Sequence, residues 1–318
     1  MNREAEEHEG FFTFYWDARK GQLRLKVDRW EPFLYLQGLS SGLGSNPVGL
    51  DRGQLGKERV VHFRRVGPKV FLIQPNLRFR ADSINEEERR AVEESFASSV
   101  LASFDILAED EDGSVLIDLT PFLMTDAHDV VGTLRETNQG AYQLDGNRSY
   151  LYWPRIKGFP KNCEFEAALT FSATEPGNHV RETAANPNAV TLRQHHSFIE
   201  LPDPGYQTRK FDPRVGTFKM SYADYAADIG DPLWKHFVTR HRLEKRDPDQ
   251  PQSVAKEPIV YYVDSGAPPE IKQALIEGAS WWNAAFETAG YIDAFQVREL
   301  PEGVDPMDVR YNVIQWVP

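Results

Sequence analysis

The pattern of apolar and polar positions between residues 11 and 246 is typical of short β-strands joined in hairpins. Phe11–Asp17 is mostly aromatic, Gln22–Asp28 has an apolar residue at every second position, and Ala18–Gly21 separate the two runs. The pair Glu58–Val66 and Lys69–Gln74 is predicted in the same way, and so are two runs that meet around Glu111–Gly113 and three longer strands at Arg148–Phe159, Asn162–Ser172 and Ala189–Pro202. This pattern predicts a meander of antiparallel hairpins.

Two helices are predicted within this β-rich region. Ser83 and Glu86 match a capping box. In this motif the serine side chain accepts a hydrogen bond from the backbone N–H of the glutamate, and the glutamate side chain accepts one from the backbone N–H of the serine. The apolar face of that helix is predicted to consist of Val92, Phe96, Val100 and Phe104. Asp126–Glu136 predicts a second, short helix, and Trp234–Lys245 is compatible with a strand or a short helix.

The segment Pro258–Pro318 has a different order of elements: strand, helix, strand, strand. The helix is predicted over Ala267–Gly290, where apolar residues recur every three or four positions and Gly290 provides a C-terminal cap. Because Trp281 and Trp282 are adjacent, we expect one to pack on a sheet and the other on a neighbouring layer. The polar, proline-rich Arg246–Pro258 predicts a domain boundary.

Several segments resemble the bacterial zinc-dependent metalloproteases of the metzincin, or matrix-metalloprotease-like, group. The resemblance is carried by EGASWWNAAFETAGYIDAFQV (Glu277–Val297) and DPMDVRYNVIQWV (Asp305–Val317). It extends over nearly the whole chain through Gly42–Gly56, Gln74–Ala81, Arg193–Tyr206 and Phe211–Phe218.

The resemblance implies an α+β fold with two domains. Residues 1–246 would form a β-rich N-terminal domain of meander hairpins with one or two helices, and residues 247–257 would be a linker. Residues 258–318 would be the incomplete first half of a metzincin-like α/β subdomain.

The activity of that family depends on the zinc-binding motif HExxHxxGxxH, in which two histidines four residues apart bind the metal and the glutamate is the general base. The motif is absent at all eight histidines: His8, His62, His128, His179, His195, His196, His236 and His241. No catalytic, cofactor-binding or metal-binding residue is therefore predicted in this chain, and zinc is expected only in a full-length family member.

Two functions remain open from the sequence. The chain is predicted to be the N-terminal part of a secreted bacterial zinc metallopeptidase, inactive by itself, whose partners are the rest of its catalytic domain and a protein or peptide substrate. The resemblance implies a periplasmic, cell-surface or secreted location. The alternative is a non-catalytic binding or scaffold module of an exported bacterial protein.

Composition narrows the range of partners. The net charge of −12 argues against nucleic acid, because such a partner requires a basic surface. No apolar run approaches the ~20 residues of a transmembrane helix. The single cysteine, Cys163, excludes an internal disulfide.

Candidate sites in this chain have structural interpretations as well as functional ones. Gly42–Gly56 lacks the phosphate-binding pattern GxxxxGK[ST], so it is predicted to be an ordered loop with glycines at positive φ, or a loop that packs on the catalytic domain through Arg52. His195 and His196 are predicted to point to opposite faces of a strand, one packed and one exposed, without metal-ligand partners.

Three further candidates also have structural interpretations. Cys163 is predicted to be a small packed residue of a strand rather than a zinc-blocking thiolate. The loop Leu201–Gly216 could pair its arginines with carboxylates of the catalytic domain or be stabilised within its own domain. Glu109 and Asp112 are predicted to be solvated in a hairpin turn, and no GxSxG elbow is present.

Overall fold

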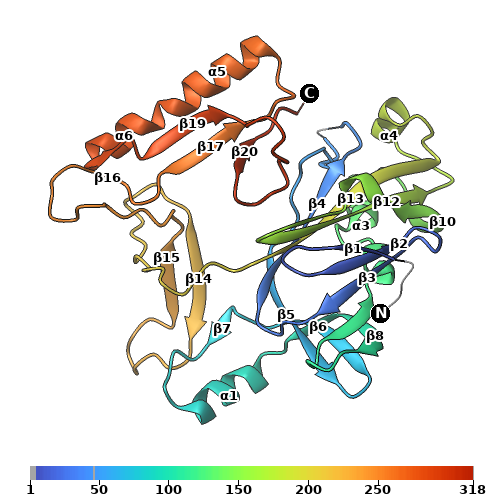
Figure 1. Cartoon of the computed structure of the whole chain (residues 1–318), viewed down its shortest axis with the longest axis horizontal. Helices are drawn as coiled ribbons and strands as arrows, with labels where there is room; N and C mark the ends of the chain where they lie inside the picture. The colour runs from blue at the N-terminus through green and yellow to red at the C-terminus, as the bar shows by residue number, and fades with distance from the viewer. Residues whose placement is uncertain (1–4, 46, 318) are drawn as a thin grey trace. The chain divides into compact units, whose positions relative to one another are not determined.

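The computed structural model describes residues 5–45 and 47–317, and these residues form a β-rich protein (Figure 1). Strands take 38% of the chain and helices 16%, and a large antiparallel sheet dominates. The predicted α+β class, with half of a metzincin-like α/β subdomain, is therefore wrong. The strands of this large sheet pair in antiparallel fashion, many with their sequence neighbours, because short alternating runs joined by tight turns bury one face in this way. Pro318, the last residue of the predicted 258–318 domain, lies outside the described residues.

Two compact units are present. The first contains the residues up to Gln74 and Val100–Leu201, and the second contains Pro75–Ser99 and Pro202–Trp316. The bounds of these compact units differ from the predicted domain boundaries at residues 246 and 258. The division into domains stays a prediction.

The first unit contains a twelve-stranded sheet. Its strands are β1 (Glu6–His8), β2 (Phe14–Asp17), β3 (Gln22–Val27), β4 (Phe33–Ser41), β5 (Arg59–Val66), β6 (Lys69–Gln74), β8 (Ser99–Glu109), β9 (Val115–Asp118), β10 (Gln143–Leu151), β11 (Lys157–Phe159), β12 (Asn162–Ser172) and β13 (Ala189–Ile199). The order is β1-β2-β3-β9-β8-β6-β5-β4-β13-β12-β10, and β11 pairs with β12.

The predicted hairpins are confirmed where turn residues mark them. Val66 pairs with Lys69 across a two-residue turn in which Gly67 has a φ of 57°. Gly113 has a φ of 81° between β8 and β9. Glycine adopts a left-handed φ without the steric cost that a side chain adds. These two glycines therefore fix where the turns lie, and the turns fix the register of the flanking strands.

Aromatic side chains fill the core of the first unit. Phe12, Phe33 and Phe198 are fully buried, and their ring centroids lie 5.1–6.2 Å apart. Phe63 and Phe165 extend this cluster at similar distances. Aromatic rings packed at tilted or edge-to-face angles and at these separations stabilise the fold beyond what the burial of their surface contributes.

Two glycines allow Glu9–Phe11 to pack on β11. A Cβ on Gly158 would lie 2.0 Å from the carbonyl oxygen of Glu9, and one on Gly10 would lie 2.7 Å from the Cα of Gly158. The N–H of Phe11 donates to the carbonyl of Phe159 at 2.8 Å. Only glycine permits this approach of two backbones.

Short helices connect the strands of the first unit. They are α2 (Thr120–Leu123), the 3₁₀ turn η1 (Trp153–Arg155), α3 (Val130–Glu136) and α4 (Asn178–Thr183). The short helix predicted at Asp126–Glu136 is confirmed as α3, and both carboxylate oxygens of Asp126 accept backbone N–H groups at its start.

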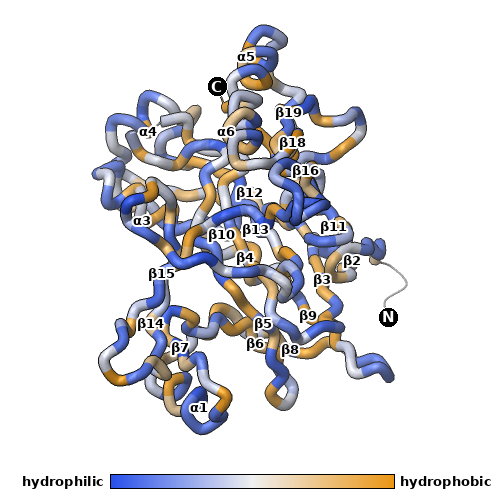
Figure 2. Tube along the Cα trace, turned by 90° about the vertical axis from the view of Figure 1, so that its left-hand side faces the viewer, coloured by the Kyte–Doolittle hydropathy of each residue, from blue (hydrophilic) through white to orange (hydrophobic). Residues whose placement is uncertain are grey.

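The predicted helix after Ser83 is shorter than expected. It is α1 (Glu86–Ser95), it belongs to the second unit, and Asn85 rather than Ser83 caps it. Val100 and Phe104 lie in strand β8, so the predicted apolar face beyond Ser95 is wrong. Figure 2 shows α1 mostly in the hydrophilic colour, as expected for a helix with one buried residue, Val92.

The second unit contains three small sheets. Their strands are β7 (Phe79–Arg80), β14 (Lys219–Asp224) and β15 (Trp234–Val238); β16 (Ser253–Val254) and β18 (Tyr291–Ile292); and β17 (Ile259–Val263), β19 (Phe295–Glu299) and β20 (Asn312–Ile314). The last three form a parallel sheet in the order β19-β17-β20 (Figure 1).

The helix predicted at Ala267–Gly290 is present but divided. It forms α5 (Pro269–Ser280) and α6 (Trp282–Thr288), which contact β17, β18 and β19. The side chains of Trp281 and Trp282 are 73% and 63% exposed, so the expectation that each packs on a layer is wrong. No helix in the described ranges is both long and apolar enough to cross a membrane.

Candidate functional site

Two glutamates lie within β12, a strand otherwise composed mainly of small and apolar residues. The side chains of Glu164 and Glu166 are 2% and 0% exposed. Alternate residues of a strand point to the same face, so both glutamates share one face and Phe165 occupies the other. The antiparallel register places Ser197 opposite Glu164 and His195 opposite Glu166 on β13.

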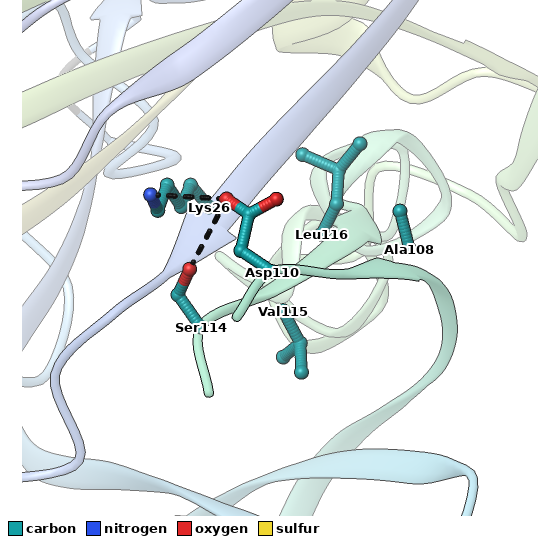
Figure 3. Close-up of a pocket in the computed structure, with 6 residues that line it drawn as sticks. All are labelled: Lys26, Ala108, Asp110, Ser114, Val115 and Leu116. Atoms are coloured by element: carbon teal, nitrogen blue, oxygen red, sulfur yellow. Dashed lines mark hydrogen bonds and ion pairs between the residues drawn. The ribbon is translucent and has the colours of Figure 1, made fainter. Parts of the chain in front are cut away.

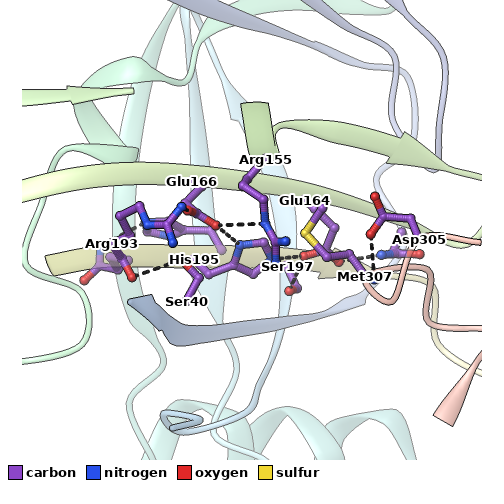
Figure 4. Close-up of polar contacts among 12 residues, drawn as sticks. Ser40, Arg155, Glu164, Glu166, Arg193, His195, Ser197, Asp305 and Met307 are labelled. Atoms are coloured by element: carbon purple, nitrogen blue, oxygen red, sulfur yellow. Dashed lines mark hydrogen bonds and ion pairs between the residues drawn. The ribbon is translucent and has the colours of Figure 1, made fainter. Parts of the chain in front are cut away.

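His195 lies between the two carboxylates (Figure 4). Its Nε2 contacts Oε2 of Glu164, and its Nδ1 lies 3.1 Å from Oε2 of Glu166. The hydroxyl of Ser197 donates to the same oxygen of Glu164 at 2.6 Å. Both ring nitrogens face acceptors, and both can donate only when the imidazole is protonated.

Two arginines lie beside the carboxylate of Glu166. Nη1 of Arg193 lies 3.3 Å from Oε1 of Glu166, and Nε of Arg155 lies 3.7 Å from Oε2. We call Glu164, Glu166, His195, Ser197, Arg193 and Arg155 the buried ion cluster. Because β12 and β13 carry all but Arg155, the cluster depends on the pairing of these two strands.

The charges of the cluster shift the pKa of His195. Burial by itself lowers the pKa of an imidazole, but the Glu164 and Glu166 carboxylates raise the pKa of His195 to about 9. At neutral pH the cluster therefore contains an imidazolium.

This shift predicts a loss of stability at alkaline pH. The folded pKa lies above the ordinary value of about 6.5, so the contribution of His195 is complete below about pH 6.5 and is lost as the pH rises through about 9. We expect the free energy of unfolding to fall by on the order of 3 kcal/mol over this range. Urea titrations from pH 6 to 10 measure it, and His195→Gln should remove most of the pH dependence. An equal fall in that variant would contradict the assignment.

The opposite face of β13 carries a second polar group, centred on His196. The amide of Gln194 is oriented by two backbone bonds: its oxygen accepts from the N–H of His128 at 2.8 Å, and its nitrogen donates to the carbonyl of Thr125 at 2.8 Å. That nitrogen also lies 2.9 Å from Nε2 of His196, which must therefore be unprotonated. Nδ1 then carries the proton and donates to the hydroxyl of Tyr35 at 2.9 Å.

His196 is consequently a neutral core residue. Its side chain is fully buried, and burial together with the neighbouring charge of His195 lowers its pKa to about 3. The predicted opposite orientation of the two histidines is confirmed by these partners. The prediction that one of them is exposed is wrong, because His195 is only 16% exposed and lies between two carboxylates.

Sequence reasoning missed Glu164 and Glu166. The sequence signal for them is Glu-Phe-Glu within a strand whose other residues suit a buried core. Carboxylates are almost never buried without a partner, so this motif indicates a buried partner of opposite charge. The partner lies about thirty residues away, and only strand register brings it close.

The cluster has the chemistry of an internal ion network. Each nitrogen of His195 is already opposite a carboxylate, so neither offers a lone pair to a metal. Among the described residues, no group of three or more His, Cys, Asp or Glu side chains could hold a metal ion. The arrangement holds a proton and joins the adjacent strands β12 and β13.

Cys163 lies next to this cluster in sequence but on the core face. Its side chain is fully buried in β12, and Sγ accepts from the N–H of Phe12 at 3.2 Å. Burial raises the pKa of the thiol to about 12. The prediction of a small packed residue is confirmed, and a thiol held protonated in this way is a poor metal ligand.

The two loops considered as candidates are ordered by their own contacts. Gly44, Gly49 and Gly53 have φ of 75–84°, which confirms the predicted left-handed glycines in Gly42–Gly56; residue 46 lies outside the described ranges. In Leu201–Gly216, Asp203 pairs with Arg242 at 2.8 Å within the second unit, which agrees with stabilisation inside its own unit.

The carboxylates of the turn at residues 109–112 are exposed to solvent, as predicted, and are also paired with cations: the side chains of Glu109 and Asp112 are 47% and 63% exposed. Glu109 accepts two hydrogen bonds from the guanidinium of Arg65, at 2.6 and 2.7 Å. The ammonium of Lys26 lies 3.3 Å from Asp110 and 3.7 Å from Asp112. Figure 3 shows Lys26 and Ser114 directed at Asp110 beside a cavity of about 10 Å³, which is large enough for one water molecule.

Comparison with known families places the buried ion cluster inside one domain. The sequence profile of a family described as a domain of unknown function (DUF5117) matches residues 53–246, which is 194 of the 318 residues. The chain therefore belongs to this family. No curated protein and no solved structure matches the chain.

Proposed function

We propose that the chain is the non-catalytic N-terminal part of a secreted bacterial zinc-dependent metallopeptidase. The observation that carries the proposal is the resemblance of Glu277–Val297 and Asp305–Val317 to that group of enzymes. Its activity is hydrolysis of peptide bonds, for which a bound zinc ion supplies an activated water molecule.

The residues of this chain do not fit the zinc ion of such an enzyme. HExxH is absent from the sequence, and the described residues contain no cluster of three ligands. We therefore assign no catalytic step to this chain, and we propose that its β-rich region supports a catalytic cleft formed by other residues.

The exposed surface of α5 and α6 supports the proposal. None of the residues in either helix is buried, and the indoles of Trp281, between the helices, and Trp282, at the start of α6, are largely exposed. Adjacent exposed tryptophans are uncommon on a surface that faces only water, because each indole has a large apolar area. A further part of the catalytic domain that packs on Trp281 and Trp282 would bury this area.

The proposal is tested by comparing this chain with the product of its complete reading frame. We expect the longer polypeptide to contain HExxHxxGxxH, to bind one equivalent of zinc and to hydrolyse casein until a chelator is added. Residues 1–318 alone should bind no stoichiometric zinc and hydrolyse nothing. In the longer polypeptide, Trp281→Ala with Trp282→Ala should lower the activity, whereas Tyr150→Ala, which removes a 57% exposed ring from the first unit, should not.

Two results would contradict the proposal. One is a complete reading frame without the zinc motif, which would favour the alternative of a non-catalytic binding module. The other is chelator-sensitive hydrolysis by residues 1–318 alone.

A further inference from the structure

The segment that leads into β14 presents apolar side chains to water. Residues 213–220 are all exposed, and among them Val215, Phe218 and Met220 are 55%, 88% and 61% exposed. The N–H of Thr239 donates to the carbonyl of Phe218 at 3.1 Å, which extends the pairing of β14 with β15 by one residue. Phe218 and Met220 therefore lie on the same face of this hairpin, because alternate residues of a strand share a face.

Backbone hydrogen bonds hold both ends of this segment at the surface. The N–H of Val238 donates to the carbonyl of Arg209 at 2.9 Å, and the carbonyl of Phe218 is the acceptor at the other end. The loop between these two bonds is therefore fastened to the strand β15 and to the residue that follows it. Exposed apolar side chains that are gathered in one place and held there are typical of a surface that binds a partner.

Cationic side chains lie along the same segment. Residues 209–220, which we call the basic loop, contain Arg209, Lys210, Arg214 and Lys219 but only one acidic residue, Asp212, although the net charge of the whole chain is −12. Asp212 pairs with Arg214 at 2.5 Å. No carboxylate of a described residue forms an ion pair with Arg209, Lys210 or Lys219. Three cations of the basic loop are thus available to an anionic partner.

An anionic lipid surface is the partner that satisfies both features of the basic loop. Lipid phosphates attract lysine and arginine side chains, and the boundary between headgroups and acyl chains takes up exposed apolar side chains. A soluble polyanion would satisfy the charges but leave the apolar side chains in water. The negative charge of the rest of the chain is screened beyond roughly 8 Å at physiological ionic strength, so it does not cancel this local attraction.

We propose that the basic loop docks the protein on an anionic lipid surface. Its apolar side chains enter the headgroup region, and its three cations without a carboxylate partner lie at the lipid phosphates. The attachment is peripheral and needs no membrane-spanning segment. The basic loop belongs to the second unit, and the inference goes beyond the proposed peptidase function and does not depend on it.

The test is sedimentation of residues 1–318 with lipid vesicles at physiological ionic strength. We expect saturable binding to vesicles of phosphatidylglycerol mixed with phosphatidylcholine, and binding roughly a hundredfold weaker to phosphatidylcholine alone, because three cations lose their anionic partners. Added salt should weaken the binding to the anionic vesicles. Absence of binding to the anionic vesicles would overturn the proposal. So would tighter binding of soluble polyglutamate, which would assign the basic loop to an acidic protein partner.

Variants separate the two contributions to binding. Phe218→Ser with Met220→Ser should weaken binding to the anionic vesicles more than tenfold, and Lys210→Gln with Lys219→Gln should weaken it about thirtyfold. Ile229→Ser is the matched control, because Ile229 is a fully exposed apolar residue outside the basic loop.

The control variant should bind as tightly as the unmodified chain. All five side chains are exposed, so the variants should keep the fold, which circular dichroism checks. Unchanged binding of the Phe218→Ser, Met220→Ser variant would contradict the proposal, and so would an equal loss in Ile229→Ser.

Discussion

Replacing Glu166 by alanine is expected to destabilise the first unit by about 3–5 kcal/mol, the usual cost of leaving a buried charge without its partner. The side chain of Glu166 is fully buried and faces His195 at 3.1 Å, Arg193 at 3.3 Å and Arg155 at 3.7 Å. Removing it leaves three cations around one remaining carboxylate, that of Glu164. The exchange of β12 and β13 backbone amides with deuterium measures the loss in the strands concerned.

An exposed ion pair of better geometry provides the matched control. Glu109 and Arg65 form two hydrogen bonds of 2.6 and 2.7 Å, but both side chains are well exposed. Glu109→Ala should have a much smaller effect than Glu166→Ala, because water replaces the lost partner of an exposed charge. Glu166→Gln, which keeps the shape, should lie between the two. If Glu166→Ala and Glu109→Ala cost the same, burial is not what makes the cluster important.

Replacing Phe198 by alanine is also expected to cost about 3–5 kcal/mol, since it removes a large ring from a closed core. Phe198 is fully buried, and its centroid lies 5.1 Å from Phe33, 5.5 Å from Phe165 and 5.7 Å from Tyr35. The loss combines the transfer free energy of the ring with the cavity it leaves. Urea unfolding followed by circular dichroism measures it.

The control is a phenylalanine whose side chain is exposed to solvent. Phe218 is 88% exposed, so Phe218→Ala should change the free energy of unfolding by less than about 0.5 kcal/mol. Phe198→Leu should recover part of the loss, because it refills much of the volume. A loss for Phe198→Ala no larger than that for Phe218→Ala would mean that the aromatic cluster does not hold the first unit together.

The hairpins could be predicted because their information is local. Gly67 and Gly113 follow apolar runs of alternating pattern, and a left-handed turn residue between two such runs specifies both the turn and the pairing. The end of α1 could not be predicted in this way. Val100 and Phe104 continue its apolar spacing, but pairing within the large sheet outweighs the weak helical preference of a short segment.

The buried ion cluster shows the limit of reasoning about candidate sites from spacing. Metal and catalytic motifs are recognisable when their residues lie on one helix or in one loop. Glu164 and Glu166 meet His195 only across a strand pair, so no short pattern in the sequence contains all three. The only indication in the sequence is that two charged glutamates lie in an otherwise apolar strand. This predicts that they have a buried partner, but it does not identify the partner.

The sequence by itself determined where the turns and most strands of this protein lie, that no HExxH zinc site is present, and that Cys163 is a core residue, since each depends on a few neighbouring residues. Only the tertiary structure decided which strands pair, that His195 is charged while His196 is neutral, and that Trp281 and Trp282 are exposed. Burial and charge depend on residues brought together from distant parts of the chain, and the free energy of those contacts is not encoded in any local pattern.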